Sequence, residues 1–294
     1  MSESVTVEQN DLFLESGAVR QEYPAALIDA HVHIYDCFHL NSFLDSALRN
    51  FQEAAQNLSV DNGHIGVLLL TETASDNKFC ELKRISTRQK AADCSFRWHF
   101  CHTEEDCSLL AVNEDSQILV IVAGRQIVSQ ENLEILALGT TRSFPERRPI
   151  EDALAMIRES QALAVLPWGF GKWFFGRGQI IERLLNSAQH KDLFLGDNSG
   201  RPGFLPQPRF FAQARKQDIR ILPGSDPLPF PRETEKPGSF GFILNHKIST
   251  ITPASDIKRL LLKPEIAVNP YGHAETLLRF ACNQVAMQVT KHKR

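Results

Sequence analysis

The sequence has no uninterrupted apolar run of about 18 residues, the length that a membrane-spanning helix requires. It also has no basic surplus, because 32 lysines and arginines face 35 aspartates and glutamates, and the net charge is −3. A general nucleic-acid-binding protein carries the opposite balance. We therefore expect neither a membrane nor a nucleic acid as a partner. A local basic pocket for an anion remains compatible with this composition.

The six cysteines include no Cys-x-x-Cys pair, and the first residues, MSESVTVEQNDLFLESG, are acidic and polar. A secretion signal would begin with basic residues and continue with an apolar stretch. In a long chain without such a signal, cysteines are reduced thiols more often than disulfides. These features predict a cytoplasmic protein.

Two widespread catalytic motifs are also missing. The glycines do not follow the spacing of a P-loop or of a dinucleotide-binding loop, and there is no Gly-x-Ser-x-Gly sequence. The sequence therefore argues against a nucleotide-dependent enzyme of either of these two kinds and against an α/β-hydrolase.

Hydrophobic residues make up 43% of the 294 residues, which is enough for a large core. The run AALIDAHVHI predicts a buried strand, helical spacing of apolar residues over 40–58 predicts a helix, and IGVLLL predicts a second buried strand. Strand, helix and strand in this order are typical of a parallel sheet. Residues 94–138 interrupt the pattern with short β-like pieces, which predicts an inserted β meander. The alternation then resumes.

The first predicted strand ends in His-x-His. Residues two apart lie on the same face of a strand, so Asp29, His31 and His33 are expected to point the same way. Two neighbouring imidazoles can chelate a divalent ion, and Asp29 or Asp36 would orient a ring or add an oxygen ligand. The alternative is a pair of hydrogen-bonded histidines without a metal.

Six segments resemble, in order, motifs of the PHP (polymerase and histidinol phosphatase) superfamily of metal-dependent hydrolases. They are LIDAHVHIYD, IGVLLLTET, VIVAGRQI, LEILALG, PIEDALAMIRESQALAVLPWG and ILPGSDPLPF, and the resemblance as a whole covers roughly residues 27–245. The resemblance implies a distorted TIM-like (β/α)7-type barrel that forms one domain over residues 1–294. In this domain, residues 1–22 would be a lead-in, 94–138 a β-rich insertion and 246–294 C-terminal helices.

The resemblance also implies a metal site, but an incomplete one. His31, His33 and Asp226 match ligand positions of the family, and Glu72 stands where the family has another ligand. Other ligand positions are replaced, by Thr73, Gln126, Glu134, Trp168 and Leu228. We therefore expect one divalent ion, Zn, Mn or Fe, or none. Asp226 and Glu72 are the candidate catalytic residues, with Glu72 as a further ligand or general base.

The segment WGFGKWFFGRG, residues 168–178, combines glycines and aromatic residues with Lys172 and Arg177. Such a segment suits a loop that covers a substrate, and its two cations suit a phosphate or carboxylate. Arg201, after a predicted strand, is a third candidate for binding an anion. The alternative for the loop is a structural role, with aromatic rings in the core and charges in water.

Three functions remain open from the sequence. The first is a metal-dependent hydrolase that acts on a phosphoester or another small anionic substrate. The second is a catalytically inactive relative of the PHP superfamily that binds a small molecule or a protein. The third is a mononuclear amidohydrolase-like enzyme, although the strands near residues 165 and 195 lack the histidines that such an enzyme needs.

Overall fold

The computed structural model describes residues 20–60, 63–89, 97–187, 190, 192–204 and 206–292. The larger of its sheets has seven strands, of which β2, β3 and β6 run parallel to one another. In spatial order its strands are β14 (Asn269–Tyr271), β12 (Gly241–Leu244), β2 (Ala26–Val32), β3 (Ile65–Leu70), β6 (Ile118–Val122), β5 (Ser108–Asn113) and β4 (Trp98–His102).

A second sheet has five strands, and β9, β10 and β11 form its parallel part. Its order is β11 (Ile221–Gly224), β10 (Leu193–Asn198), β9 (Leu163–Pro167), β8 (Glu134–Leu138) and β7 (Gly124–Val128). The short strands β1 (Glu22–Tyr23) and β13 (Ile248–Ser249) pair with each other.

The prediction of a distorted TIM-like (β/α)7-type barrel is wrong for the residues that the structure describes. Its strands form separate sheets of mixed direction, because β8 is antiparallel to both of its neighbours, β7 and β9, and β12 is antiparallel to β2. An isolated bridge between Glu72 and Arg125 is a local link between the end of β3 and β7. Apolar periodicity identifies a strand but carries no information on its direction or its neighbours, which is why the sequence did not reveal this arrangement.

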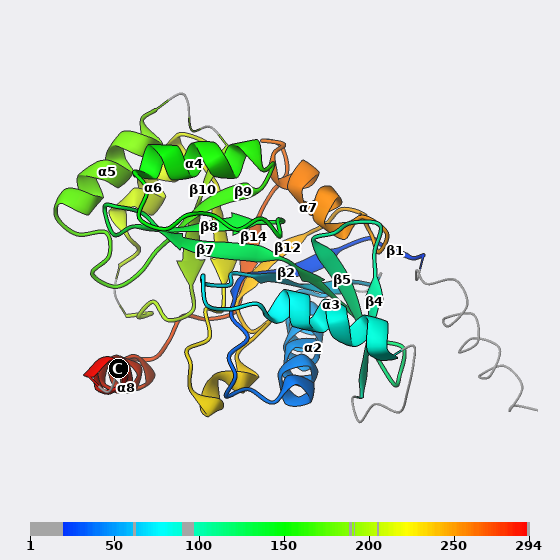
Figure 1. The fold of residues 1–294 in the computed structure, drawn as a ribbon. Coiled ribbons are helices and arrows are strands. Elements are labelled where there is room, and N and C mark those ends of the chain that lie inside the picture. The colour runs from blue at the N-terminus through cyan, green and yellow to red at the C-terminus, as the bar shows by residue number, and fades with distance from the viewer. Residues whose placement is uncertain are drawn as a thin grey trace, which may run out of the picture.

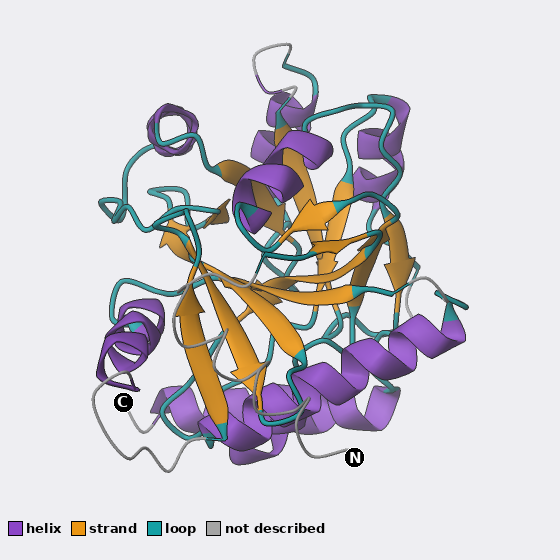
Figure 2. Cartoon of the chain, turned by 90° about the vertical axis from the view of Figure 1, so that its right-hand side faces the viewer, coloured by secondary structure: helices purple, strands orange, loops and turns teal. Residues whose placement is uncertain are grey.

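The two larger sheets share one apolar core. Side chains such as Ile28 and Val67 from the seven-stranded sheet pack with Val165 and Phe194 from the five-stranded sheet. Helices cover the outer sides, as Figures 1 and 2 show. On the five-stranded side lie α4 (Ile150–Glu159), α5 (Gly176–Leu185) and α6 (Arg209–Lys216), and on the seven-stranded side lie α2 (Leu40–Asn57) and α3 (Lys78–Gln89).

The helix predicted over residues 40–58 is confirmed as α2, whose apolar residues at helical spacing, such as Phe43, Ala47 and Phe51, are buried. Helix α7 (Pro253–Leu261), the 3-10 helix η2 (Pro231–Glu235) and α8 (Leu277–His292) follow β11 in the chain. No helix among the described residues has the length and apolar character needed to cross a membrane.

The predicted β meander is divided between the sheets. Strands β4, β5 and β6 form antiparallel pairs in the larger sheet, whereas β7 and β8 pair in the smaller one. Of the predicted lead-in at residues 1–22, the first 19 lie outside the described residues, as do residues 94–96 of the insertion. The division of the chain into one domain with these segments stays a prediction.

Strand β2 does not alternate evenly. Its pairing with β3 shifts between Asp29 and Val32, which is the signature of a β-bulge. Ile28 therefore packs into the core between the sheets, whereas Val32 packs into the core under α2. In an evenly alternating strand, residues 28 and 32 would lie on one face, and the bulge reverses this alternation. The irregular segment includes His31 and ends one residue before His33.

Candidate metal centre

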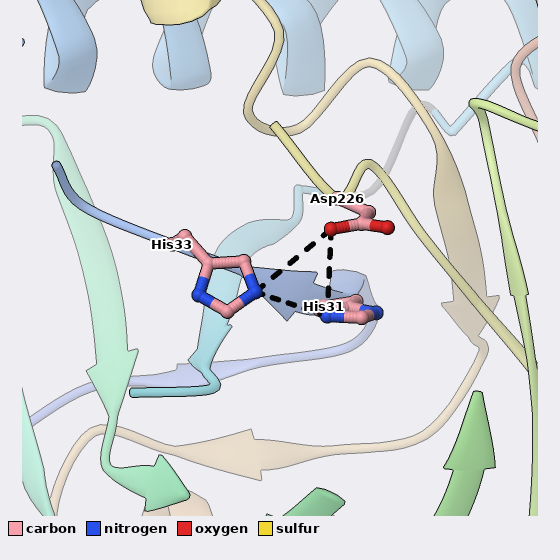
Figure 3. A group of neighbouring side chains, drawn as sticks. All are labelled: His31, His33 and Asp226. Atoms are coloured by element: carbon pink, nitrogen blue, oxygen red, sulfur yellow. Dashed lines mark hydrogen bonds and ion pairs between the residues drawn. The ribbon is translucent and has the colours of Figure 1, made fainter. Parts of the chain in front are cut away.

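The three residues expected to hold a metal come together at the ends of two strands that belong to different sheets. His31 and His33 lie at the end of β2, and Asp226 follows β11 by two residues. Figure 3 shows their side chains directed at one another. Among the described residues, they are the only group of at least three histidine, cysteine, aspartate or glutamate side chains arranged closely enough to share an ion.

Backbone contacts bring the two strand ends together. The Asp226 N–H donates to the carbonyl oxygen of His31 at 2.8 Å. A Cβ atom on Gly224 would lie 2.3 Å from the backbone nitrogen of His31, so only glycine permits this approach. Asp226 itself has a φ of +48°, a left-handed conformation that costs an ordinary residue about 1–2 kcal/mol. Aspartate tolerates this conformation better than most residues.

The ligand atoms have the separations expected around one ion. His31 Nε2 lies 3.2 Å from His33 Nε2, and Asp226 Oδ1 lies 3.5 Å from the first and 3.8 Å from the second. Ligands about 2.05 Å from a tetrahedral zinc ion are about 3.3 Å apart. Both imidazoles are 5% exposed, and the donor set of two nitrogens and one carboxylate oxygen is one that zinc accepts. The residues present therefore fit a divalent ion.

The electrostatics favour the protonation states that a metal requires. Burial, followed by the charge of His31, lowers the pKa of His33 to about 4, so its ring is neutral at pH 7. Burial raises the pKa of Asp226, but the charges of His31, His33 and Lys236 outweigh it, and the pKa falls below the ordinary aspartate value. A neutral imidazole and an ionised carboxylate are the forms that bind metal ions.

The ring of His33 is held by packing and not by a hydrogen bond to Nδ1, the nitrogen that faces away from the other two residues (Figure 3). Nδ1 of His33 is buried and has no hydrogen-bond partner among the described residues, whereas most metal-binding histidines donate from this position. The ring of Tyr35 stacks on it instead, with centroids 5.4 Å apart and planes at 22°. The Thr71 hydroxyl oxygen lies 3.3 Å from His33 Nε2, the same ring nitrogen that lies 3.2 Å from His31 Nε2.

Asp29 and Asp36 do not contribute ligands. The Asp29 carboxylate accepts the backbone N–H groups of Ser225 at 2.7 Å and Gly238 at 2.8 Å, so it holds the loop that carries Asp226. Asp36 is exposed and pairs with Lys78 at 2.7 Å. The hypothesis that one of them orients a histidine ring is therefore corrected: Asp29 orients backbone.

Glu72, expected as a further ligand, does not join the three residues either. Its Oε1 accepts the backbone N–H of Phe79 at 2.6 Å, in the first turn of α3, and its Oε2 lies 3.1 Å from an Arg125 guanidinium nitrogen. A carboxylate at a helix N-terminus is stabilised by the free N–H groups there. Both oxygens are engaged by the fold, and the roles of Glu72 as a further ligand and as a general base stay predictions.

The three predicted anion-binding cations differ in their surroundings. Lys172 forms an ion pair with Glu134, and its charge contributes to lowering the pKa of both His33 and Asp226. Arg177 donates to the carbonyl oxygen of Gly171 within its own loop. Arg201 is buried and makes a two-pronged pair with Asp197, at 2.8 and 3.0 Å.

A fourth residue, Asn198, contacts the three candidate ligands through Asp226. It is the last residue of β10 and pairs in register with Gly224, the last residue of β11. Its Nδ2 donates to Asp226 Oδ2 at 3.0 Å and to the carbonyl oxygen of Trp168 at 2.9 Å. The available signal was its position at the end of a strand, next to a strand that leads to a candidate ligand.

No protein-family model matches the chain, and no curated protein matches it in sequence. Two solved structures show low similarity. PsfC from Pseudomonas syringae PB-5123 is 13% identical over 92% of this chain and 98% of its own, with a TM-score of 0.48. The lesion-specific endonuclease PfuEndoQ from Pyrococcus furiosus is 11% identical over 83% of this chain and 57% of its own, with a TM-score of 0.44. At this level, neither structure assigns a fold or an activity to the chain.

Proposed function

We propose that His31, His33 and Asp226 bind one divalent metal ion, and that the protein is a hydrolase of phosphoesters or other small anionic substrates. The observation that carries the proposal is the mutual approach of three ligand atoms to 3.2–3.8 Å at two strand ends. Zinc, manganese and iron all suit this donor set. The phosphoester itself comes from the resemblance to the PHP superfamily.

The charge of the donor set supports an anionic substrate. Two neutral imidazoles and one carboxylate carry a single negative charge, which offsets half the charge of a divalent ion and leaves the site attractive to an anion. Lys172 adds a cation at the edge, where its side chain is 42% exposed and held by Glu134. When bound, a divalent ion polarises a phosphoryl or carbonyl oxygen and activates water. The chain's own residues hold the ion and bind the anionic group.

Metal analysis of the purified protein tests the proposal. We expect close to one equivalent of zinc, manganese or iron per chain, lost in His31→Ala and His33→Ala. The matched control is His99→Ala, because His99 is exposed on β4, at one edge of the seven-stranded sheet. Added metal should raise the unfolding temperature of the native protein and of the control, but not that of the two variants.

A substrate panel separates the functions. Phosphomonoesters, phosphodiesters and amides are offered to the protein with each metal, and we expect hydrolysis of an anionic ester that depends on both histidines. Hydrolysis of amides alone would favour the amidohydrolase-like enzyme. A folded protein that takes up no metal from micromolar zinc or manganese would contradict the proposal and favour the catalytically inactive binding protein.

A further inference from the structure

The side-chain amide of Asn198 lies between the candidate metal centre and the loop that carries Lys172. Asn198 is 7% exposed, and its Nδ2 donates to two oxygens, Asp226 Oδ2 and the carbonyl oxygen of Trp168. Both neighbours are acceptors, so the amide nitrogen rather than the amide oxygen must face them. The orientation of the amide is therefore determined by its surroundings.

This contact fixes the rotation of the Asp226 carboxylate. The last torsion of an aspartate is broad, because it joins a tetrahedral carbon to a planar group. With Oδ2 held at 3.0 Å by Asn198, the free Oδ1 is the atom 3.5 Å from His31 Nε2 and 3.8 Å from His33 Nε2. The backbone of Asp226 is anchored separately, by its N–H on the His31 carbonyl oxygen.

We infer that Asn198 is a positioning residue of the metal centre, which holds the Asp226 carboxylate in the orientation that presents one oxygen to an ion. The inference rests on the proposed metal site and adds an outer residue to it. Outer hydrogen-bond partners of metal ligands typically change metal affinity 10–100-fold when they are removed. Asn198 also ties the start of the Trp168 loop to the same carboxylate.

A purely structural role would have a different signature. Ser199, the next residue, donates from its hydroxyl to the carbonyl oxygen of Ser225 at 2.7 Å. It thus holds the loop that carries Asp226 without touching the Asp226 carboxylate. Ser199→Ala is therefore the matched control. If Asn198 only fastens the loop, the two variants should lose stability and metal affinity in similar proportion. If Asn198 positions the carboxylate, affinity should fall only in the Asn198 variants.

The experiment measures Zn²⁺ affinity of the full chain by competition with a chromophoric chelator. Asn198→Ala and the near-isosteric Asn198→Leu should bind Zn²⁺ about 10–100-fold more weakly than the native protein. Ser199→Ala should bind within about 3-fold of the native protein, because the carboxylate contact persists. Unfolding temperatures in the presence of a chelator show which variants are folded, and Asn198→Leu preserves the test if Asn198→Ala is unstable.

The visible absorption of bound Co²⁺ gives a second, spectroscopic readout. The Co²⁺ spectrum of the Asn198 variants should differ from that of the native protein, whereas the spectrum of Ser199→Ala should match it. Native affinity and a native Co²⁺ spectrum in both Asn198 variants would overturn this inference while the proposed metal site stands. If the native protein itself binds neither Zn²⁺ nor Co²⁺, the proposed site fails, and the role of Asn198 fails with it.

Discussion

Asp226 is bound to His31 twice, once through the backbone and once through the side chains. Its N–H donates to the His31 carbonyl oxygen at 2.8 Å, and its Oδ1 lies 3.5 Å from His31 Nε2. The backbone contact joins β2 of one sheet to the end of β11 in the other, so the geometry of the metal centre depends on how the two sheets meet. An ion held here would link the two sheets.

The first prediction concerns the charge of Asp226. Asp226→Asn keeps the size of the side chain and an oxygen that can accept from Asn198, but it removes the only negative charge of the donor set. We expect Zn²⁺ affinity to fall by more than the 10–100-fold expected for the Asn198 variants. The reason is that Asp226→Asn changes the metal ligand itself, whereas the Asn198 variants change only its hydrogen-bond partner. Isothermal titration of the metal-free protein measures this. Equal affinity in Asp226→Asn and native protein would remove Asp226 from the site.

The second prediction concerns the contact between the sheets at Gly224. In Gly224→Ala, the new methyl group would lie 2.3 Å from the His31 backbone nitrogen and 2.6 Å from its Cβ. The strand end must shift, and we expect a loss of about 3 kcal/mol in the free energy of unfolding together with loss of metal binding. Urea unfolding measures the first effect, and chelator competition measures the second.

Gly176→Ala provides the control for this substitution. A Cβ atom at Gly176, the first residue of α5, meets nothing within 4 Å, and the residue has no positive φ. Its replacement should be neutral or stabilising by up to about 1 kcal/mol, because alanine favours the helix. If Gly224→Ala were equally harmless, the close approach of β11 to His31 would not be required.

The sequence predicted the two histidines better than the third ligand. His31 and His33 lie two residues apart at the end of an apolar run, so their proximity follows from strand geometry alone. Asp226 was reached through the family resemblance, because a contact between distant residues has no local signal. The contact of Asn198 with Asp226 could not be predicted, because it depends on the register of β10 against β11, which pairs Asn198 with Gly224.

Local contacts that the sequence does not mark surround several of these residues. Glu72 has the residue type and position of a ligand, and its role stays a prediction, but its oxygens contact the start of α3 and Arg125. The uniform alternation expected in β2 fails at a bulge, which the sequence between Asp29 and Val32 does not mark. The barrel prediction failed for a similar reason, because periodic apolar residues located β7, β8 and β12 without indicating that they run antiparallel to their neighbours.

The third prediction concerns the recognition of an anion by Lys172. Lys172→Met keeps the length of the side chain and removes its charge, which is paired with Glu134 and acts on His33 and Asp226. We expect KM for an anionic ester to rise about 10–100-fold, because a charge-assisted hydrogen bond contributes about 1.5–3 kcal/mol, while Zn²⁺ content stays unchanged. Arg177→Met is the comparison, since Arg177 donates to Gly171 within the loop. A larger effect on KM in Arg177→Met than in Lys172→Met would reverse the assignment.

The fourth prediction treats Arg201 as a structural residue instead of the anion-binding residue expected from the sequence. The side chains of Arg201 and Asp197 are 10% and 9% exposed, and each satisfies the other. Removing one partner of a buried ion pair leaves an uncompensated charge, so Arg201→Met should lower the free energy of unfolding by about 3–5 kcal/mol. Replacing both residues, Asp197→Leu with Arg201→Met, should recover most of this loss, because an apolar pair of similar volume needs no partner charges.

Urea unfolding of the native protein, both single variants and the double variant completes this cycle. A coupling energy of at least about 2 kcal/mol between residues 197 and 201 is expected for a buried, two-pronged pair. If the losses in the free energy of unfolding were additive, the two side chains would not stabilise each other. Arg201 would then be available to bind an anion. The KM of the folded double variant shows whether Arg201 also binds the anionic substrate. If Arg201 is structural and Lys172 binds the anion, the KM of the double variant stays close to that of the native protein.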